Sequence, residues 1–198
     1  GEENQWDDFT QQIPDLFWVV DPIDGTVNYS RQIPLFGITI ALISHHKPIV
    51  AGIAFPALGD RHTAIKGQGA WLNGQKIQVS KTQNIREAII GIGDFSVGNN
   101  SSQKNAIAHA LIQHYAGQCL RIRMLGTAAL QLAWLATGKL DMSITLSNKS
   151  WDVQAGVLLV QEAGGLVFDE DGTKHNLKSC RTLATNAYLK THLLDFFS

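Results

Sequence analysis

Short apolar runs separated by polar turns fill the first half of the chain, and they predict β-strands. The expected strands cover residues 16–20, 36–43, 48–55, 61–66, 70–72 and 88–92. His45 and His46 stand between two of these runs, and Asn73 and Gly74 follow a later one. These polar pairs predict tight turns, and the first of them predicts a β-hairpin.

Longer amphipathic or wholly apolar segments dominate the second half and predict helices. The helices are expected at residues 102–115, 127–137, 152–163 and 187–197, with short strands at 120–124, 140–146, 166–168 and 182–184. Strands and helices mix throughout, without repeats or obvious linkers. The pattern therefore predicts a layered α/β or α+β fold, with residues 1–198 as a single domain.

The apolar run at 16–20 ends in two carboxylates, Asp21 and Asp24, with Pro22 between them. A run that is apolar on both faces suits the middle of a sheet, and pairing is expected to stop at Pro22 because proline has no N–H. Two nearby carboxylates repel each other unless a cation lies between them, and Mg²⁺ prefers oxygen ligands. The stretch predicts a magnesium site at the end of this strand.

Gly25 and Thr26 follow these acids with backbone N–H groups and a hydroxyl. If a helix begins here, as residues 26–29 permit, its first N–H groups form an anion site. A metal beside an anion site indicates a phosphate ester. An inert turn is the alternative interpretation, because Asp-Pro and Asp-Gly are common turn dipeptides.

A second informative stretch begins at Trp151 and Asp152, where the helix predicted at 152–163 starts. Taken alone, Asp152 is typical of a helix N-cap. Ala155 and Gly156 are small and would let this helix approach another element closely.

Together these stretches resemble motifs of the inositol monophosphatase family. The first reads D-P-I-D-G-T-V-N-Y at 21–29 and the second W-D-V-Q-A-G-V-L-L-V-Q-E-A-G-G at 151–165. Gly1-Glu2-Glu3 resembles the family's upstream metal motif, residues 67–74 its hairpin, and residues 125–129 its substrate-side helix start. The resemblance covers nearly the whole chain and implies an αβαβα sandwich of the inositol monophosphatase/fructose-bisphosphatase type.

The resemblance also implies a phosphatase that depends on two or three Mg²⁺ ions. Glu2, Asp21 and the carbonyl of Ile23 would hold one ion, and Glu2 would help to bind a weaker third. Asp21, Asp24 and Asp152 would hold the second. Two metals of this kind activate water and stabilise the leaving alkoxide.

Other matched positions would bind the substrate. Gly25 and Thr26 would bind phosphate through backbone N–H groups, and the Thr26 hydroxyl would help to orient the attacking water. The alcohol part of the substrate would face a third group of residues, namely Gly126, Thr127 and Ala128.

Two departures from the family pattern matter. Family members carry several tens of residues before the G-E-E motif, including an acid that helps Thr26, so we expect an N-terminal segment to be missing from this chain. Members that hydrolyse inositol phosphates have a glutamate seven residues before the second-motif aspartate, where this chain has Thr145. Inositol monophosphate remains the leading substrate, and histidinol phosphate is the alternative within the family.

Composition limits the other function classes. The chain has 16 basic and 17 acidic residues and a net charge of −1, which argues against nucleic-acid and membrane partners. The expected partner is a small phosphate monoester, the substrate. No signal peptide is visible, and Cys119 and Cys180 form no metal or disulfide motif, so we expect a cytoplasmic protein. Relatives commonly form homodimers, and the oligomeric state stays open. A regulatory binding protein that retains the fold is the alternative from a different class.

Overall fold

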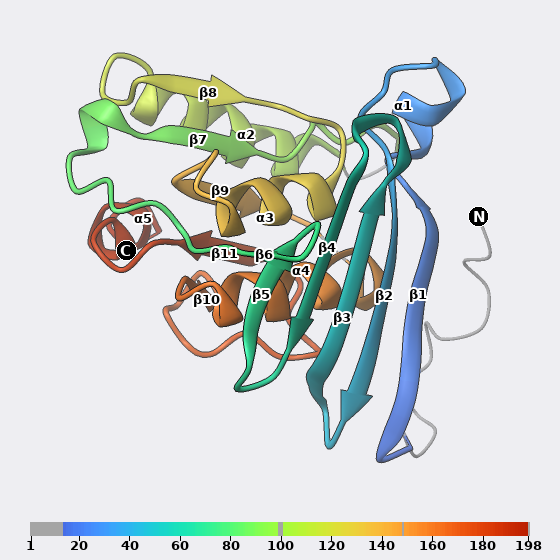
Figure 1. Cartoon of the computed structure of the whole chain (residues 1–198). Helices are drawn as coiled ribbons and strands as arrows, with labels where there is room; N and C mark the ends of the chain where they lie inside the picture. Colours follow the sequence, from blue (N-terminus) through green and yellow to red (C-terminus); the bar gives the residue numbers. More distant parts are fainter. Residues whose placement is uncertain (1–13, 99–100, 148, 198) are drawn as a thin grey trace.

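Six antiparallel strands form the first sheet, in the order β1-β2-β3-β4-β5-β6 (Figure 1). The computed structural model describes residues 14–98, 101–147 and 149–197. The hairpin turns are confirmed, because His45, His46, Asn73 and Gly74 have φ between 45° and 82°. The strands of this sheet are β1 (Leu16–Asp24), β2 (Gly37–Ser44), β3 (Lys47–Phe55), β4 (Asp60–Ile65), β5 (Gly69–Leu72) and β6 (Gln75–Lys76).

Among the described residues, strand β1 lies at the edge of this sheet, whereas its apolar run predicted a strand in the middle. Leu16, Trp18 and Val20 are 60%, 55% and 49% exposed, which leaves one apolar face of β1 uncovered by the described residues. An apolar run indicates that both faces of a strand favour burial. The position of that strand within the sheet depends on which distant segments pair with it.

Pairing also continues past Pro22, contrary to the prediction. Asp21 pairs with Thr39, the register then shifts, and Asp24 pairs with Gly37. Pro22 therefore lies within an irregularity of the ladder, which a residue without an N–H tolerates.

The second sheet has the order β10-β11-β9-β7-β8. Strand β7 runs parallel to both β8 and β9, whereas β11 is antiparallel to its neighbours. The loops that follow β7 and β9 therefore leave the same edge of the sheet, which is where open α/β sheets commonly bind ligands. The strands are β7 (Ile89–Ile92), β8 (Arg121–Arg123), β9 (Met142–Thr145), β10 (Leu166–Phe168) and β11 (Thr182–Thr185).

Helices α3 (Ala128–Ala136) and α4 (Ser150–Glu162) lie between the two sheets (Figure 1). Helices α2 (Ser101–Tyr115) and α5 (Lys190–Leu194) pack on the other face of the second sheet. The described residues thus form β, α, β and α layers, four of the five layers expected. Short helices complete the list: α1 (Thr26–Ser30) and two 3₁₀ turns at Pro56–Leu58 and Ile85–Glu87.

Helix α4 packs closely against α3, as its small residues predicted. A Cβ atom added to Gly156 would lie 2.6 Å from Cδ1 of Leu132, so only glycine permits this approach. The helix begins at Ser150, two residues before the predicted start, and α5 is shorter than the predicted helix at 187–197.

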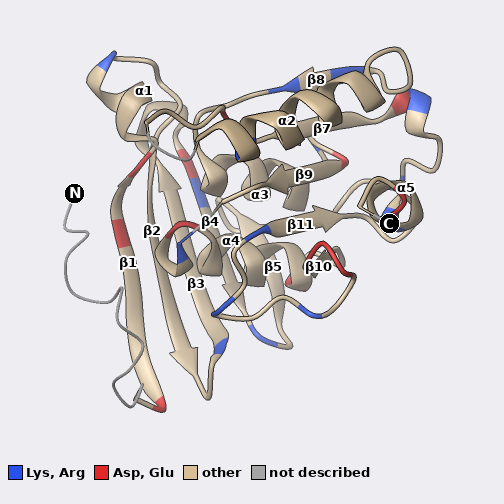
Figure 2. Cartoon of the chain, turned by 180° about the vertical axis from the view of Figure 1, so that it is seen from behind, with Lys and Arg blue, Asp and Glu red and all other residues tan. Residues whose placement is uncertain are grey.

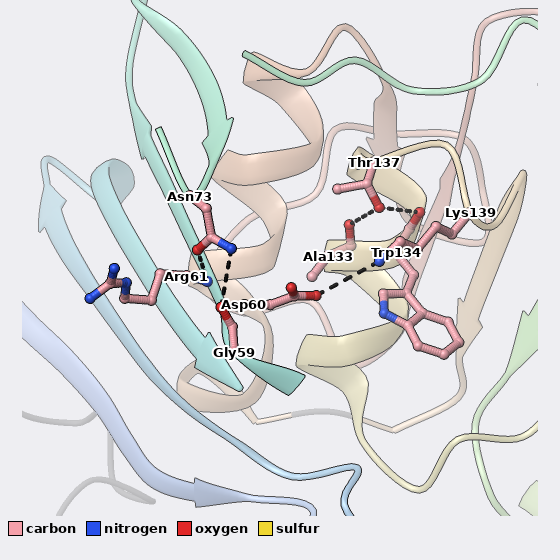
Figure 3. A network of polar contacts seen from close by, with 8 residues as sticks. All are labelled: Gly59, Asp60, Arg61, Asn73, Ala133, Trp134, Thr137 and Lys139. Carbon is pink, nitrogen blue, oxygen red and sulfur yellow. Dashed lines mark hydrogen bonds and ion pairs between the residues drawn. The ribbon is translucent and has the colours of Figure 1, made fainter. Parts of the chain in front are cut away.

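Apolar side chains fill both sides of the second sheet. One cluster joins the first sheet to α3 and α4, and the other joins the second sheet to α2 and α5. Polar contacts also connect β4 to the end of α3, where Nζ of Lys139 lies 3.7 Å from Oδ2 of Asp60 (Figure 3). Asn73 closes the adjoining hairpin by accepting from the Arg61 N–H at 2.9 Å and donating to the Gly59 carbonyl at 3.1 Å.

Charged residues are spread over many elements. In Figure 2, the acidic and basic positions of the described residues are distributed over strands, helices and loops. Among the described residues, no helix combines the length and apolar character needed to cross a membrane.

Candidate active site

Asp24 is the buried acid at the centre of the candidate site. Asp24 is only 7% exposed and is the last residue of β1. The Thr127 hydroxyl donates to Oδ2 of Asp24, and the Ala129 N–H donates to the same oxygen at 3.1 Å. Both donors belong to the start of α3, so this helix fixes the carboxylate and leaves Oδ1 for a ligand.

Asp21 and Asp152 approach Asp24 from β1 and α4. Buried Thr39 connects their elements, because it pairs with Asp21 across the ladder and its hydroxyl donates to the Trp151 carbonyl at 3.1 Å. Asp152 is the third residue of α4, and its Oδ2 accepts the Lys149 N–H at 3.1 Å. It therefore belongs to the first turn of the helix, and the N-cap interpretation was wrong because the helix begins earlier.

The three carboxylates influence one another electrostatically. The pKa of Asp24 is raised from 3.8 to about 7, mainly because burial disfavours the charged form, and the charges of Asp21 and Asp152 add to this effect. The hydrogen bonds from Thr127 and Ala129 act in the opposite direction. No positively charged group of the described part of the chain contributes to lowering this pKa.

The donor set suits a hard divalent cation. Within the described residues, no three or more His, Cys, Asp or Glu side chains converge into a complete metal cluster. Glu2, another predicted ligand, lies outside those residues. The remaining donors are carboxylate oxygens, which fit Mg²⁺ in kind. A cation here would offset both the cost of burying the Asp24 charge, which is the main cause of its raised pKa, and the smaller repulsion from Asp21 and Asp152.

The turn after Asp24 is held against the start of α3. Gly25 has φ of +82°, and a Cβ atom there would lie 3.0 Å from the Leu35 carbonyl oxygen and 3.3 Å from Cβ of Thr127. Buried Asn28 donates to the carbonyls of Leu35 at 2.7 Å and Leu125 at 2.8 Å. Asn28 thus connects the D-P-I-D-G-T stretch to the turn that carries Gly126 and Thr127.

A pocket of about 190 Å³ opens beside Asp24 and Asp152. Several predicted site residues line it: Asp24, Gly126, Thr127, Ala128, Thr145 and Asp152. Others lie in the adjoining β1–α1 segment and do not line the pocket: Asp21, Ile23, Gly25 and Thr26. The structure thereby brings together three motifs that are far apart in the sequence.

The pocket also contains residues that the sequence prediction missed. They come from the loop after β7, the start of α2, the middle of α3 and the loop after β9: Gly93, Asp94, Ser96, Lys104, Asn105, Gln131, Leu146 and Ser147. No local motif marks them. For the residues of the two loops the signal is that β7 and β9 are parallel neighbours, which places the loops after them at the same edge.

Comparison with known proteins identifies the fold and the motifs. Residues 1–196 match the family model described as "Inositol monophosphatase family". The chain belongs to the inositol monophosphatase family. Members of this family are phosphoric monoester hydrolases, and the resemblance of the motifs is confirmed.

Individual relatives agree with this assignment. The chain is 37% identical to inositol monophosphatase 2 of Solanum lycopersicum, over 90% of this chain and 67% of that protein. It is 34% identical to Nus factor SuhB of Pseudomonas aeruginosa, over 94% of this chain and 68% of that protein. The chain thus spans about two thirds of the length of these relatives.

A solved structure extends the agreement to the fold. The inositol monophosphatase of Anabaena superposes with a TM-score of 0.86 at 32% identity, covering 94% of this chain and 73% of that one. The predicted sandwich of the inositol monophosphatase type is therefore confirmed.

Proposed function

We propose that this chain carries the active site of a Mg²⁺-dependent phosphatase, which hydrolyses phosphate monoesters of small alcohols, with inositol monophosphate as the leading substrate. One observation carries the proposal. The buried Asp24 carboxylate is held by α3 at the edge of a pocket, and the charges of Asp21 and Asp152 act on it.

The proposed ligands of Mg²⁺ are Asp21, Asp24, Asp152, the carbonyl of Ile23 and Glu2, for two or three ions. When bound, Mg²⁺ supplies an activated water and charge stabilisation for the leaving alkoxide. With a pKa of about 7, Asp24 is partly protonated at neutral pH, and it must be deprotonated to act as a ligand. Metal binding and deprotonation of Asp24 are therefore coupled.

The other residues of the site position the substrate in this proposal. The N–H groups of Gly25 and Thr26 bind the phosphate, and the Thr26 hydroxyl helps to orient the attacking water. Thr127 and Ala129 keep Asp24 in one orientation, which preserves the geometry that phosphoryl transfer requires. Gly126, Thr127 and Ala128 face the alcohol.

Two alternatives compete with this proposal. Histidinol phosphate is the alternative substrate, because Thr145 stands at a position where an acid is expected for inositol phosphates. A regulatory binding protein is the alternative of another class, and the name of the Pseudomonas aeruginosa relative, Nus factor SuhB, supports testing it. A homodimer and a cytoplasmic location remain predictions from the sequence.

A phosphate-release assay with and without Mg²⁺ tests the proposal. The substrates are inositol 1-phosphate, histidinol phosphate, fructose 1,6-bisphosphate and a 3′-phosphonucleotide. Asp24→Asn should lower Mg²⁺-dependent turnover by about 100-fold or more, because it removes a charged ligand from a buried site. Asp15→Asn is the matched control, since the Asp15 side chain is 82% exposed. Full turnover by folded Asp24→Asn, or no release by the wild type with any ester, would contradict the phosphatase proposal.

A further inference from the structure

The loop after β7 and the start of α2 contribute a charged part of the pocket lining, which we call the α2 end. Besides Asp24 and Asp152, its lining contains two charged residues, Asp94 from the loop after β7 and Lys104 from the first turns of α2. Neither side chain forms an ion pair with another described residue. Both charges are therefore available to a ligand.

The positions of these two residues are set by hydrogen bonds around them. The Asn105 side chain accepts the Ser96 N–H at 2.8 Å and donates to the Ser96 carbonyl at 2.9 Å, which ties the start of α2 to the loop that carries Asp94. The Gly93 N–H donates to the Ile144 carbonyl at 2.8 Å, so the residue before Asp94 is bound to the end of β9. The loop and the helix form one wall of the pocket.

Thr145 adds an independent sign that this end of the pocket meets a ligand. It is 7% exposed and lines the pocket, and its hydroxyl has no hydrogen-bond partner within the described residues. A buried hydroxyl without a partner is costly, and a hydroxyl on a ligand would satisfy it. A Cβ atom added to Gly93 would lie 3.8 Å from Cα of Thr145, which places Asp94 one residue from this orphan group.

We propose that Asp94 and Lys104, together with the Thr145 hydroxyl, select the alcohol part of the substrate and favour an uncharged polyol over an alcohol that carries a net charge. This inference rests on the proposed phosphatase function. A cationic alcohol would be attracted by Asp94 and repelled by Lys104, and an anionic alcohol would meet the reverse. A polyol uses both side chains, because its hydroxyls can donate to Asp94 and accept from Lys104.

This arrangement also explains how a site with threonine at position 145 recognises hydroxyls. The charged acceptor comes from the neighbouring strand end, at Asp94, and Thr145 contributes a neutral donor and acceptor. Asp94 and Lys104 are specificity residues in this proposal, whereas Asp24 and Asp152, the lining acids proposed to bind Mg²⁺, belong to β1 and α4.

Opposite charge changes at this end test the proposal. Asp94→Asn leaves a positive end, and Lys104→Met leaves a negative one. Each variant of the full chain is assayed with inositol 1-phosphate, with cationic histidinol phosphate and with fructose 1,6-bisphosphate, which carries a second phosphate. Asp15→Asn and Lys66→Met are matched controls on exposed residues outside the pocket.

Both variants should lower kcat/KM for inositol 1-phosphate by about tenfold, mostly through KM, because each loses a charged hydrogen-bonding partner. Relative to inositol 1-phosphate, Lys104→Met should gain preference for histidinol phosphate and Asp94→Asn for fructose 1,6-bisphosphate. These opposite shifts separate recognition from a merely structural effect, which would lower turnover of all three esters alike.

Equal losses on every substrate, or unchanged preferences in both variants, would overturn the inference. A wild-type preference for histidinol phosphate that Asp94→Asn abolishes would also overturn it, in favour of a cationic alcohol. If the wild type releases no phosphate from any ester, the proposed function fails separately. Calorimetric binding of the same esters to the same variants then tests the charge preferences directly.

Discussion

Thr127 holds Asp24 through a hydrogen bond from its hydroxyl to Oδ2, between residues separated by 103 positions in the chain. The same hydroxyl accepts the Leu130 N–H at 3.1 Å and so caps helix α3. One side chain thereby joins the start of a helix to a buried acid. The stability of α3 and the orientation of the candidate metal ligand depend on a single hydroxyl.

Replacing Thr127 with valine should therefore affect stability and site together. Valine preserves the shape but removes the helix cap and a hydrogen bond to a buried carboxylate, so unfolding should become easier by about 1–3 kcal/mol. Urea denaturation measures this loss. Thr127→Ser keeps the hydroxyl and should restore most of it, and Thr63→Val, on an exposed face of β4, is the control. Equal stability of the valine and serine variants would show that the hydroxyl contributes little.

The raised pKa of Asp24 predicts a pH-dependent stability in the absence of divalent cations. Its pKa is about 7 in the folded chain and 3.8 ordinarily, so the folded state binds this proton more tightly than the unfolded state. The resulting stabilisation is complete below pH 3.8 and is lost as the pH rises through 7, by on the order of a few kcal/mol. Thermal unfolding in EDTA should show this loss, and Asp24→Asn should abolish it.

Mg²⁺ should counteract the loss at high pH. Because Asp24 must release its proton to bind a metal, Mg²⁺ should raise the melting temperature more at pH 8 than at pH 5. The comparison uses the wild type and Asp24→Asn at both pH values. An equal increase in melting temperature in the wild type and in Asp24→Asn would show that Mg²⁺ binds at another site.

Asn28 is predicted to position the substrate side of the pocket. Its buried amide donates to two carbonyls, of Leu35 and Leu125, so Asn28→Ala leaves both without this donor. We expect a loss of about 2–4 kcal/mol in the free energy of unfolding and a lower kcat, because the turn at Gly126 loosens. Gln83→Ala is the exposed control. Wild-type stability of Asn28→Ala would contradict the role of this amide.

His62 predicts a second pH effect, in the acid range. The residue is 1% exposed on β4, and neither ring nitrogen has a hydrogen-bond partner within the described residues. Burial, aided by the charge of Lys139 and opposed by that of Asp60, lowers its pKa from 6.5 to about 4. The unfolded chain takes up this proton first, so stability should fall as the pH decreases from 6.5 to 4.

Replacing His62 with leucine should remove this acid sensitivity. Leucine fills the space beside Phe55, whose ring centroid lies 5.7 Å from that of His62, without burying unpaired nitrogens. The slope of the melting temperature between pH 6.5 and 4 is the measurement, and His46→Leu on an exposed turn is the control. An unchanged slope in His62→Leu would assign the acid sensitivity to other groups.

Much of the fold could be predicted from local sequence patterns. The hairpin turns, the helices at α2, α3 and α4 and most strands follow from periodicity and turn residues, because these depend on neighbours within a few positions. The predicted boundaries of the elements were less accurate, because α4 begins earlier and α5 is shorter than the sequence predicted. The place of β1 at a sheet edge was missed, since strand order is decided by pairing between distant segments.

The sequence by itself predicted the chemistry of the candidate site, and the tertiary structure decided its surroundings. Asp21, Asp24 and Asp152 stand in motifs whose residue types suit a metal and a phosphate, and these can be found without coordinates. The hold of Thr127 on Asp24 and the charges of Asp94 and Lys104 have no local signature. The first arises because the start of α3 packs against the end of β1. The second arises because β7 and β9 run parallel, so that the loops after them leave the same edge of the sheet. Both depend on contacts between segments that are distant in the sequence.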